Sequence, residues 1–284
     1  MKKKIHRKAV SLSAISVLSI AIAMITAVTL CVAVFVSLYS NALMRDVRVN
    51  SEQIVGQTEL AVNNFFDSMK SKLMLIRDVV ENTENDDELK SRLSTLTYVQ
   101  NDIYAVTIYG ENGEILSSIG NAAELKKHIY KDLSFDKELF DSGDEIVFSE
   151  PHVQTLFKDS YPWVITTALR MRKNVLDGAY IAVDFKFSEI AAYIDNVGVG
   201  RQGYCFIEDK NGNIVYHPQQ QLLFSGLKSE KTEYIKQLPD GLTSEENVVY
   251  SIKTLSGRQW RIVGLSFTGE IAAEGERQIA LSIL

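Results

Sequence analysis

The chain contains very little cysteine and proline, with 2 Cys and 4 Pro among its 284 residues. Cys31 lies inside a long apolar segment and Cys205 is the only other cysteine, so a disulfide within a folded domain is excluded. Any folded part must therefore be stabilised by packing alone. The 46% share of hydrophobic residues supplies material for such a core and excludes a wholly disordered chain.

Histidine is also scarce, and no spacing typical of a metal or catalytic site occurs. The four histidines are His6, His128, His152 and His217. They form no ligand pattern such as H-x-x-x-H, and the P-loop, G-x-S-x-G and H-E-x-x-H spacings are missing. We therefore expect no catalytic residue, no metal site and no cofactor in these residues. His217, which precedes Pro218, is expected to be a structural residue of a hairpin edge.

Positive charge dominates only at the N-terminus. The first eight residues, MKKKIHRK, hold five basic residues and no acidic one. Residues 9–284 hold the other 25 basic residues against all 36 acidic ones, a net charge of −11. A nucleic-acid-binding protein usually carries a basic stripe on its folded part, so nucleic acid is excluded as a partner.

The apolar segment over residues 9–39 has no charged residue. As a helix it would be about 46 Å long, against a hydrocarbon core of about 30 Å. We predict a transmembrane helix at 9–39, with residues 1–8 as a cytoplasmic tail and residues 40–276 extracellular, by the positive-inside rule. A signal peptide cleaved near Ala21–Ala23 is the alternative, but about 16 more apolar residues follow that site. A lipoprotein anchored through Cys31 is disfavoured, because Leu30 stands where a small residue is expected.

The last residues repeat this apolar character on a smaller scale. After EGER at 274–277 the sequence ends with QIALSIL. We expect residues 277–284 to be the start of a second transmembrane helix that is cut short. An ordinary amphipathic terminus is the alternative.

A helical apolar stripe follows the predicted membrane segment. Its members, spaced by three or four residues, are Val62, Phe65, Met69, Leu73, Ile76 and Val80. This spacing predicts a long exterior helix over residues 40–84 that packs through the stripe. The run NTENDD at 82–87 ends that pattern and predicts a short helix from about Glu88.

The remaining sequence contains an internal repeat. Residues 105–117 read AVTIYGENGEILS and residues 204–216 read YCFIEDKNGNIVY. Each predicts a β-hairpin, in which Asn-Gly would supply two positive-φ turn positions. The tetrapeptide EIAA also recurs, at 189–192 and 270–273. We therefore predict two tandem α/β modules, at 85–195 and 196–276. The first is longer, and its additional residues around 128–161 could roof a pocket.

The second hairpin carries a family resemblance. Residues 203–218 combine Gly-Tyr, a strand, Asp-x-x-Gly, a second strand and Tyr-His-Pro. With the membrane helix, the long helix and the two modules, this pattern resembles the double Cache sensor domain of bacterial receptors over residues 40–276. The ending GRQWRIVG at 257–264 is closest to Gram-positive sensor histidine kinases. The resemblance implies an α+β fold of two PAS-like antiparallel-sheet modules. It also implies that the membrane-distal module binds a small polar molecule. The proximal module would relay the resulting movement to the second membrane helix.

The resemblance also indicates candidate binding residues in the distal module. It places Trp163 on a central strand and Asp184 where amino-acid-binding relatives contact the ligand's amino group. Those relatives have Arg and Tyr where this chain has Tyr161 and Val164. This departure speaks against an α-amino acid ligand.

The residues themselves support the same site. The predicted ligand-binding residues are Tyr161, Trp163, Thr167, Tyr180 and Asp184. The first four offer aromatic walls and hydroxyl groups. Asp184 lies in an apolar strand, where a buried carboxylate is costly unless it is paired. It could contact the ligand, form an internal pair with Arg170 or Arg172, or be exposed.

These observations favour the ligand-sensing input region of a membrane receptor. A two-component sensor histidine kinase is the leading hypothesis, a methyl-accepting chemotaxis receptor the second and a nucleotide cyclase the third. Two rivals from other classes are a membrane-anchored extracellular enzyme and an adhesion module. The expected partners are a small polar ligand, the membrane and a second copy of the chain, since a long exterior helix favours a homodimer.

Overall fold

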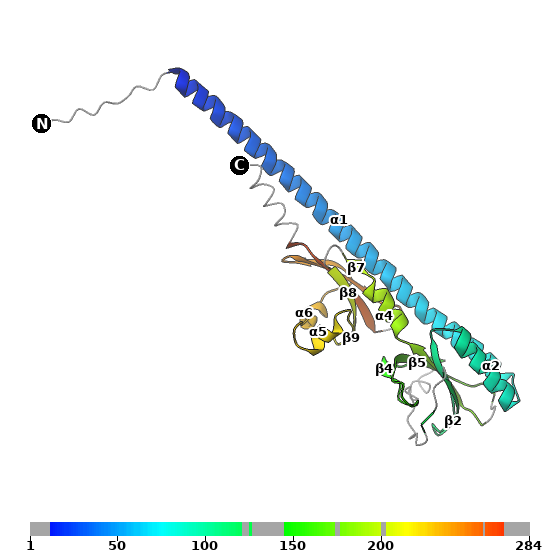
Figure 1. The fold of residues 1–284 in the computed structure, drawn as a ribbon. Helices are drawn as coiled ribbons and strands as arrows, with labels where there is room; N and C mark the ends of the chain where they lie inside the picture. Colours follow the sequence, from blue (N-terminus) through cyan, green and yellow to red (C-terminus); the bar gives the residue numbers. More distant parts are fainter. Residues whose placement is uncertain are drawn as a thin grey trace.

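The computed structural model describes residues 12–120, 125–126, 145–173, 177–199, 203–257 and 259–269. The predicted α+β class, with a long N-terminal apolar helix and two antiparallel sheets, is confirmed (Figure 1). The basic tail, the C-terminal apolar segment and the second EIAA tetrapeptide lie outside the described residues.

Helix α1 (Leu12–Glu81) runs without a break through the predicted membrane segment and along both sheets (Figure 1). The predicted segments over 9–39 and 40–84 meet within this one helix, and no proline interrupts the chain between them. The α1 side chains that face the core are at most 4% exposed: Val55, Val62, Phe66, Met69, Leu73, Ile76 and Val80. Phe66 takes the buried place expected for Phe65, which is half-buried.

Helix α2 (Asp86–Val99) begins two residues before the predicted start. The Asn85 side chain caps it, because its Oδ1 accepts hydrogen bonds from the backbone N–H groups of Asp87 and Glu88 at 2.9 and 3.1 Å. Leu89 and Leu93 are buried beneath it.

The distal sheet has the strand order β2-β1-β6-β5-β3, and β4 also pairs with β5. Its strands are β1 (Ile103–Tyr109), β2 (Ile115–Gly120), β3 (Ile146–Phe148), β4 (His152–Val153), β5 (Trp163–Arg170) and β6 (Tyr180–Lys186). All pairs are antiparallel, and α4 (Ser188–Asp195) follows β6.

The proximal sheet has the order β10-β11-β12-β8-β7, with β9 paired to β8. Its elements are β7 (Gly198–Val199), β8 (Gly203–Asp209), β9 (Ile214–Tyr216), α5 (Gln220–Phe224), α6 (Thr232–Ile235), β10 (Gly241–Glu245), β11 (Val248–Thr254) and β12 (Trp260–Phe267). Helices α5 and α6 lie on the side of this sheet away from α1 (Figure 1).

Both predicted hairpins form, but their turns differ from the expected type. Only the glycines have positive φ, 81° at Gly113 and 83° at Gly212. The backbone N–H of Gly113 donates to the Gly110 carbonyl at 3.1 Å, and Gly212 donates to Asp209 at 3.0 Å. Each is therefore a three-residue loop with a single left-handed glycine, not a two-residue loop with two positive-φ positions.

Candidate functional site

The two faces of the distal sheet are different. Residues on the face toward α1 join the main core, among them Val106, Ile165 and Val183. We call the opposite side the outer face. Small buried residues form its centre: Ala105, Thr107, Thr166, Ala168 and Ala182. Half of the predicted roof, residues 128–144, lies outside the described residues.

The proximal sheet is filled at the matching positions. The repeat aligns Ala105 with Tyr204 and Thr107 with Phe206. Phe206 is fully buried in a cluster with Tyr250 and Leu265. At these two positions the proximal module therefore has aromatic side chains where the distal module has alanine and threonine. Large side chains also pack on the distal outer face, because Phe157 clusters with Ala105, and Tyr109 and Tyr180 cluster with Ala182.

Asp184 lies on the outer face beside Thr166, its partner across the β5–β6 pair. Its side chain is 3% exposed. The Thr166 hydroxyl donates to Oδ1 at 2.6 Å, and the Gln154 amide donates to Oδ2. Burial raises the pKa of Asp184, although the hydrogen bonds from Thr166 and Gln154 oppose that shift.

A histidine extends this group of hydrogen bonds. His152 Nε2 lies 3.3 Å from Thr166 Oγ1, and its Nδ1 lies 3.0 Å from the carbonyl oxygen of Glu150. Because Thr166 gives its only hydroxyl proton to Asp184, its oxygen is left as the acceptor on the side of His152. Asp184, Thr166 and His152 therefore form one connected chain on the outer face.

The structure brings only some of the predicted site residues together. Tyr180 and Asp184 share the outer face, and the Tyr180 hydroxyl lies 3.4 Å from Glu111 Oε1. Thr167 lies on the α1 side, with its hydroxyl 3.5 Å from the Val183 carbonyl. Side chains alternate along a strand, so Thr166 takes the place expected of Thr167.

The two aromatic candidates lie away from this group. Trp163 is 44% exposed, and its ring centroid lies 6.1 Å from that of Phe187. Tyr161 is 57% exposed, with the Lys126 ammonium 4.9 Å from its ring centroid. Neither side chain borders Asp184, because strand alternation turns Trp163 toward the other face and Tyr161 precedes the strand.

The internal arginine pair considered for Asp184 does not form. Arg170 Nη2 lies 3.2 Å from Glu111 Oε1, and the backbone N–H of Arg172 donates to Glu81. Within the described ranges no Lys or Arg forms an ion pair with Asp184. The exposed alternative is equally wrong, as its 3% exposure shows.

Gln154, His152 and Thr166 were missed by the sequence reasoning. Residues two apart in a strand point to the same side, so the sequence could have predicted that His152 and Gln154 share one face. Their approach to Asp184 depends on the pairing of β4 with β5, which no local pattern encodes.

The proximal module has a buried polar cluster of its own, built on His217 and Glu230. The backbone N–H of Gln219 donates to His217 Nδ1 at 2.9 Å, so Nε2 carries the ring proton and donates to Glu230 Oε1 at 3.1 Å. The Tyr204 hydroxyl and the Lys228 ammonium also reach Glu230, at 2.8 and 3.3 Å. The polar groups of this cluster therefore bond to one another, which agrees with a structural role for His217.

Comparison with known proteins identifies the fold. The Cache domain family model (dCache_1) matches residues 39–273, most of the chain. The chain belongs to the Cache domain family. This membership agrees with the α+β architecture and with the predicted sensor-domain resemblance.

The relatives of this Cache domain are chemoreceptors. The chain is 24% identical to the methyl-accepting chemotaxis protein McpB of Bacillus subtilis (strain 168) over 225 residues, 76% of this chain and 31% of that protein. It therefore spans about a third of the length of that relative.

Solved structures show the same fold at low identity. The ligand-binding domain of the Campylobacter jejuni chemoreceptor Tlp3, in complex with 4-methylisoleucine, superposes with a TM-score of 0.64 at 17% identity, over 80% of this chain and 93% of that one. The ligand-binding domain of the Pseudomonas aeruginosa PAO1 amino acid chemoreceptor PctC, with GABA, gives 0.57 at 16%, over 75% and 96%. The predicted closeness to Gram-positive histidine kinases is not confirmed, because these relatives are chemoreceptors.

Proposed function

We propose that this Cache domain is the ligand-sensing input region of a methyl-accepting chemotaxis receptor. The similarity to McpB supports this reading over the histidine kinase that the sequence first favoured. Ligand binding on the outer face of the distal sheet is supported by one observation above all. A buried carboxylate, Asp184, lies beside Ala105 and Thr166 on the outer face, and the proximal module has the aromatic Tyr204 at the position that matches Ala105.

The ligand proposed is a small molecule with an ammonium group. Asp184 has neutral donors, Thr166 and Gln154, and a buried carboxylate gains most from a cationic partner. Similar domains bind amino acids, GABA in PctC and asparagine in Mlp24. The absence of the Arg and Tyr expected beside Trp163 means that the ligand's carboxylate, if it has one, would be bound by other groups than in amino-acid-binding relatives.

The proposed topology places the Cache domain outside the cell. Among the described residues, α1 contains a segment that is long and apolar enough to cross a membrane. The N-terminal basic residues would then lie in the cytoplasm. The module limits of 85–195 and 196–276 and the homodimer remain part of this proposal.

Signalling would follow from a difference in affinity between two arrangements of the domain. A ligand shifts such an equilibrium only as far as it binds one arrangement more tightly. Because α1 contacts both sheets and continues into the apolar segment, a change in its packing would be carried to the membrane. No catalytic step is required.

The test is thermal unfolding of the full chain in nanodiscs with amino acids, GABA, short amines, carboxylates and sugars. A ligand at about 100 times its Kd should raise stability by roughly 2.7 kcal/mol and Tm by several degrees. Asp184→Asn should abolish a shift caused by a ligand with an ammonium group, because the neutral amide cannot pair with that group. Exposed Glu189 supplies a matched control, Glu189→Gln, which should respond as the wild type does.

Two results would contradict this proposal. If an amine still raises Tm in the Asp184→Asn variant, Asp184 does not bind the ligand. If no amine raises the Tm of the wild type, the ligand is not an amine. The kinase alternative is tested separately by the coding sequence after Leu284. A long helical signalling hairpin supports the chemotaxis receptor, and a phosphorylatable histidine before an ATP-binding domain supports the kinase.

A further inference from the structure

The connection between β3 and β4, residues 149–152, contacts Thr166 through both of its ends. The backbone N–H of Ser149 donates to the Thr166 carbonyl at 2.8 Å, and the Ser149 hydroxyl accepts the Thr166 N–H at 2.9 Å. At the other end, His152 Nε2 lies 3.3 Å from Thr166 Oγ1, the hydroxyl that donates to Asp184. The position of this connection therefore depends on the position of the Thr166 side chain.

The connection is also stiff. A single residue, Pro151, separates Glu150 from His152. A proline ring fixes its own φ and restricts the residue before it to extended conformations. In addition, His152 Nδ1 lies 3.0 Å from the carbonyl oxygen of Glu150. A displacement of the imidazole ring therefore displaces Glu150 as well.

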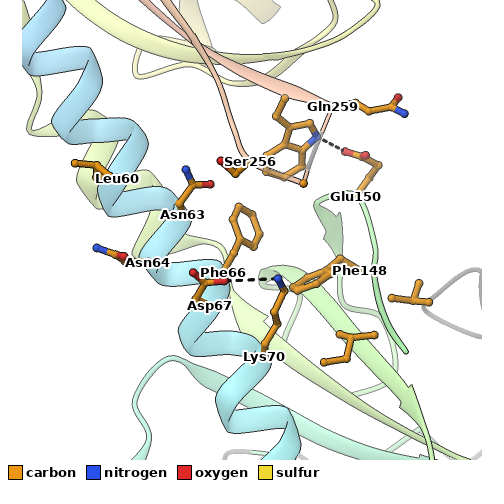
Figure 2. A pocket seen from close by; sticks show the side chains of 14 residues that line it. Leu60, Asn63, Asn64, Phe66, Asp67, Lys70, Phe148, Glu150, Ser256 and Gln259 are labelled. Carbon is orange, nitrogen blue, oxygen red and sulfur yellow. Dashed lines mark hydrogen bonds and ion pairs between the residues drawn. The ribbon is translucent and has the colours of Figure 1, made fainter. Parts of the chain in front are cut away.

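The Glu150 side chain crosses to the proximal module. Its Oε2 accepts the indole N–H of Trp260 at 3.1 Å (Figure 2). Trp260 is 2% exposed, and a buried indole N–H that loses its acceptor costs free energy. The bond therefore ties the β3–β4 connection of the distal sheet to the first residue of β12.

Strand β12 extends from this bond to α1. It is paired with β11 on one side and with β8 on the other, so it cannot bend independently of the proximal sheet. Near its other end, the Ser266 hydroxyl lies 2.6 Å from the Ser51 hydroxyl of α1, and both serines are 1% exposed. A displacement at Trp260 is therefore carried along β12 to the part of α1 that precedes both sheets.

We infer that residues 149–152 form a latch between the modules, which couples the occupancy of Asp184 to Trp260 and β12. An ammonium group at Asp184 would share the carboxylate oxygens with Thr166 and Gln154, so the Thr166 hydroxyl takes a different position in the occupied state. The latch then carries this difference to Trp260. The inference deepens the proposed function and rests on it for the ligand, whereas the contacts of the latch lie within the protein.

The experiment reads the indole N–H of Trp260. The sequence has two tryptophans, so the full chain in nanodiscs gives two indole signals in a proton–nitrogen correlation spectrum, and Trp163→Phe assigns the one from Trp260. Thr166→Val removes the hydroxyl and keeps the shape of the side chain. We expect it to shift the Trp260 signal and to make deuterium exchange of that N–H about threefold faster, because a loosened latch opens more often. His152→Ala, at a half-buried position, should act in the same direction, and Thr166→Ser, which keeps the hydroxyl, should stay close to the wild type.

Two controls separate the latch from a general loss of structure. Thr107→Val removes another buried hydroxyl of the outer face, which lies 2.8 Å from Ser118 Oγ, and should leave the Trp260 signal unchanged. Glu150→Ala removes the acceptor of the indole N–H at an exposed position, and in that background Thr166→Val should have no further effect on Trp260. The inference is overturned if Thr166→Val leaves the signal unchanged, or if it acts equally in both backgrounds.

The ligand arm uses GABA and the short amines of the stability test. An amine that raises Tm should also shift the Trp260 signal of the wild type, and should not shift it in Glu150→Ala. An amine that raises Tm without moving that signal overturns the latch and leaves the proposed function standing. If no amine raises Tm while Thr166→Val still moves the signal, the proposed function fails and the latch stands.

Discussion

At the scale of single residues, the two modules surround their buried carboxylates, Asp184 and Glu230, with different groups. Among the described residues, the groups that donate hydrogen bonds to Asp184 are the neutral side chains of Thr166 and Gln154, and burial raises its pKa. Glu230 in the proximal module is surrounded by His217, Tyr204 and Lys228. The second carboxylate is therefore paired with a cation of the protein itself, and under the proposed function the first would gain a cationic partner from the ligand.

The Glu230 cluster predicts a loss of stability in acid. Burial pushes the pKa of Glu230 upward, but the hydrogen bonds from His217 and Tyr204 and the charge of Lys228 outweigh it, so the pKa lies below its ordinary value of 4.5. A lowered folded pKa means a contribution that is complete above about pH 4.5 and lost as pH falls through the folded pKa. Denaturant unfolding should show Glu230→Gln about 1–3 kcal/mol less stable at pH 7, as for other losses at hydrogen-bonded charges.

The difference between wild type and Glu230→Gln should narrow steadily below pH 4.5. A constant difference from pH 7 to pH 3 would show that the carboxylate charge contributes nothing. Exposed Glu189→Gln is the matched control and should follow the wild type at every pH.

At the scale of elements, the proximal sheet and α1 approach each other closely at one glycine. A Cβ atom on Gly264 of β12 would lie 2.4 Å from Val55 Cγ2. Valine in a helix has one strongly preferred rotamer, so this methyl group cannot easily move aside. Glycine is therefore required here by the close packing of a strand against a helix.

Gly264→Ala should destabilise the chain by about 1–3 kcal/mol through overpacking. In a Val55→Ala background the obstructing methyl is gone, so the same substitution should cost at least about 1 kcal/mol less in a double-mutant cycle. Gly198→Ala is the control, because nothing lies within 4 Å of a Cβ there. Equal costs of Gly264→Ala in both backgrounds would show that Val55 is not the obstacle.

At the scale of the whole molecule, α1 makes the two modules one structure. It contacts both sheets, and Phe66 touches Phe148 of the distal module and Trp260 of the proximal one. An edge-to-face cluster shared by three segments links their unfolding, because its loss weakens both modules at once.

Phe66→Ala should therefore cost about 3–5 kcal/mol and separate the unfolding of the two modules. Calorimetry should show one transition for the wild type and a broadened or divided one for the variant. Phe65→Ala, at the half-buried neighbouring position, should lower Tm less and keep a single transition. A single sharp transition for Phe66→Ala would show that the modules are joined by other contacts.

The sequence by itself determined the elements whose signals are local. The apolar stripe identified the buried side of α1, the glycines fixed both hairpins, and the repeat indicated two similar sheets. It also identified Asp184, because a carboxylate in an apolar strand stands out without knowledge of its neighbours.

Only the tertiary structure decided which residues meet Asp184. Strand pairing places Thr166 opposite it and brings close His152 of β4 and Gln154, which follows β4, while Thr167 and Trp163 turn to the other side. A register shift of one residue would reverse these faces, and register depends on pairing between segments far apart in the chain. The contact of Phe66 with Phe148 and Trp260 could not be predicted for the same reason, since the three rings come from distant segments that only packing on α1 brings together.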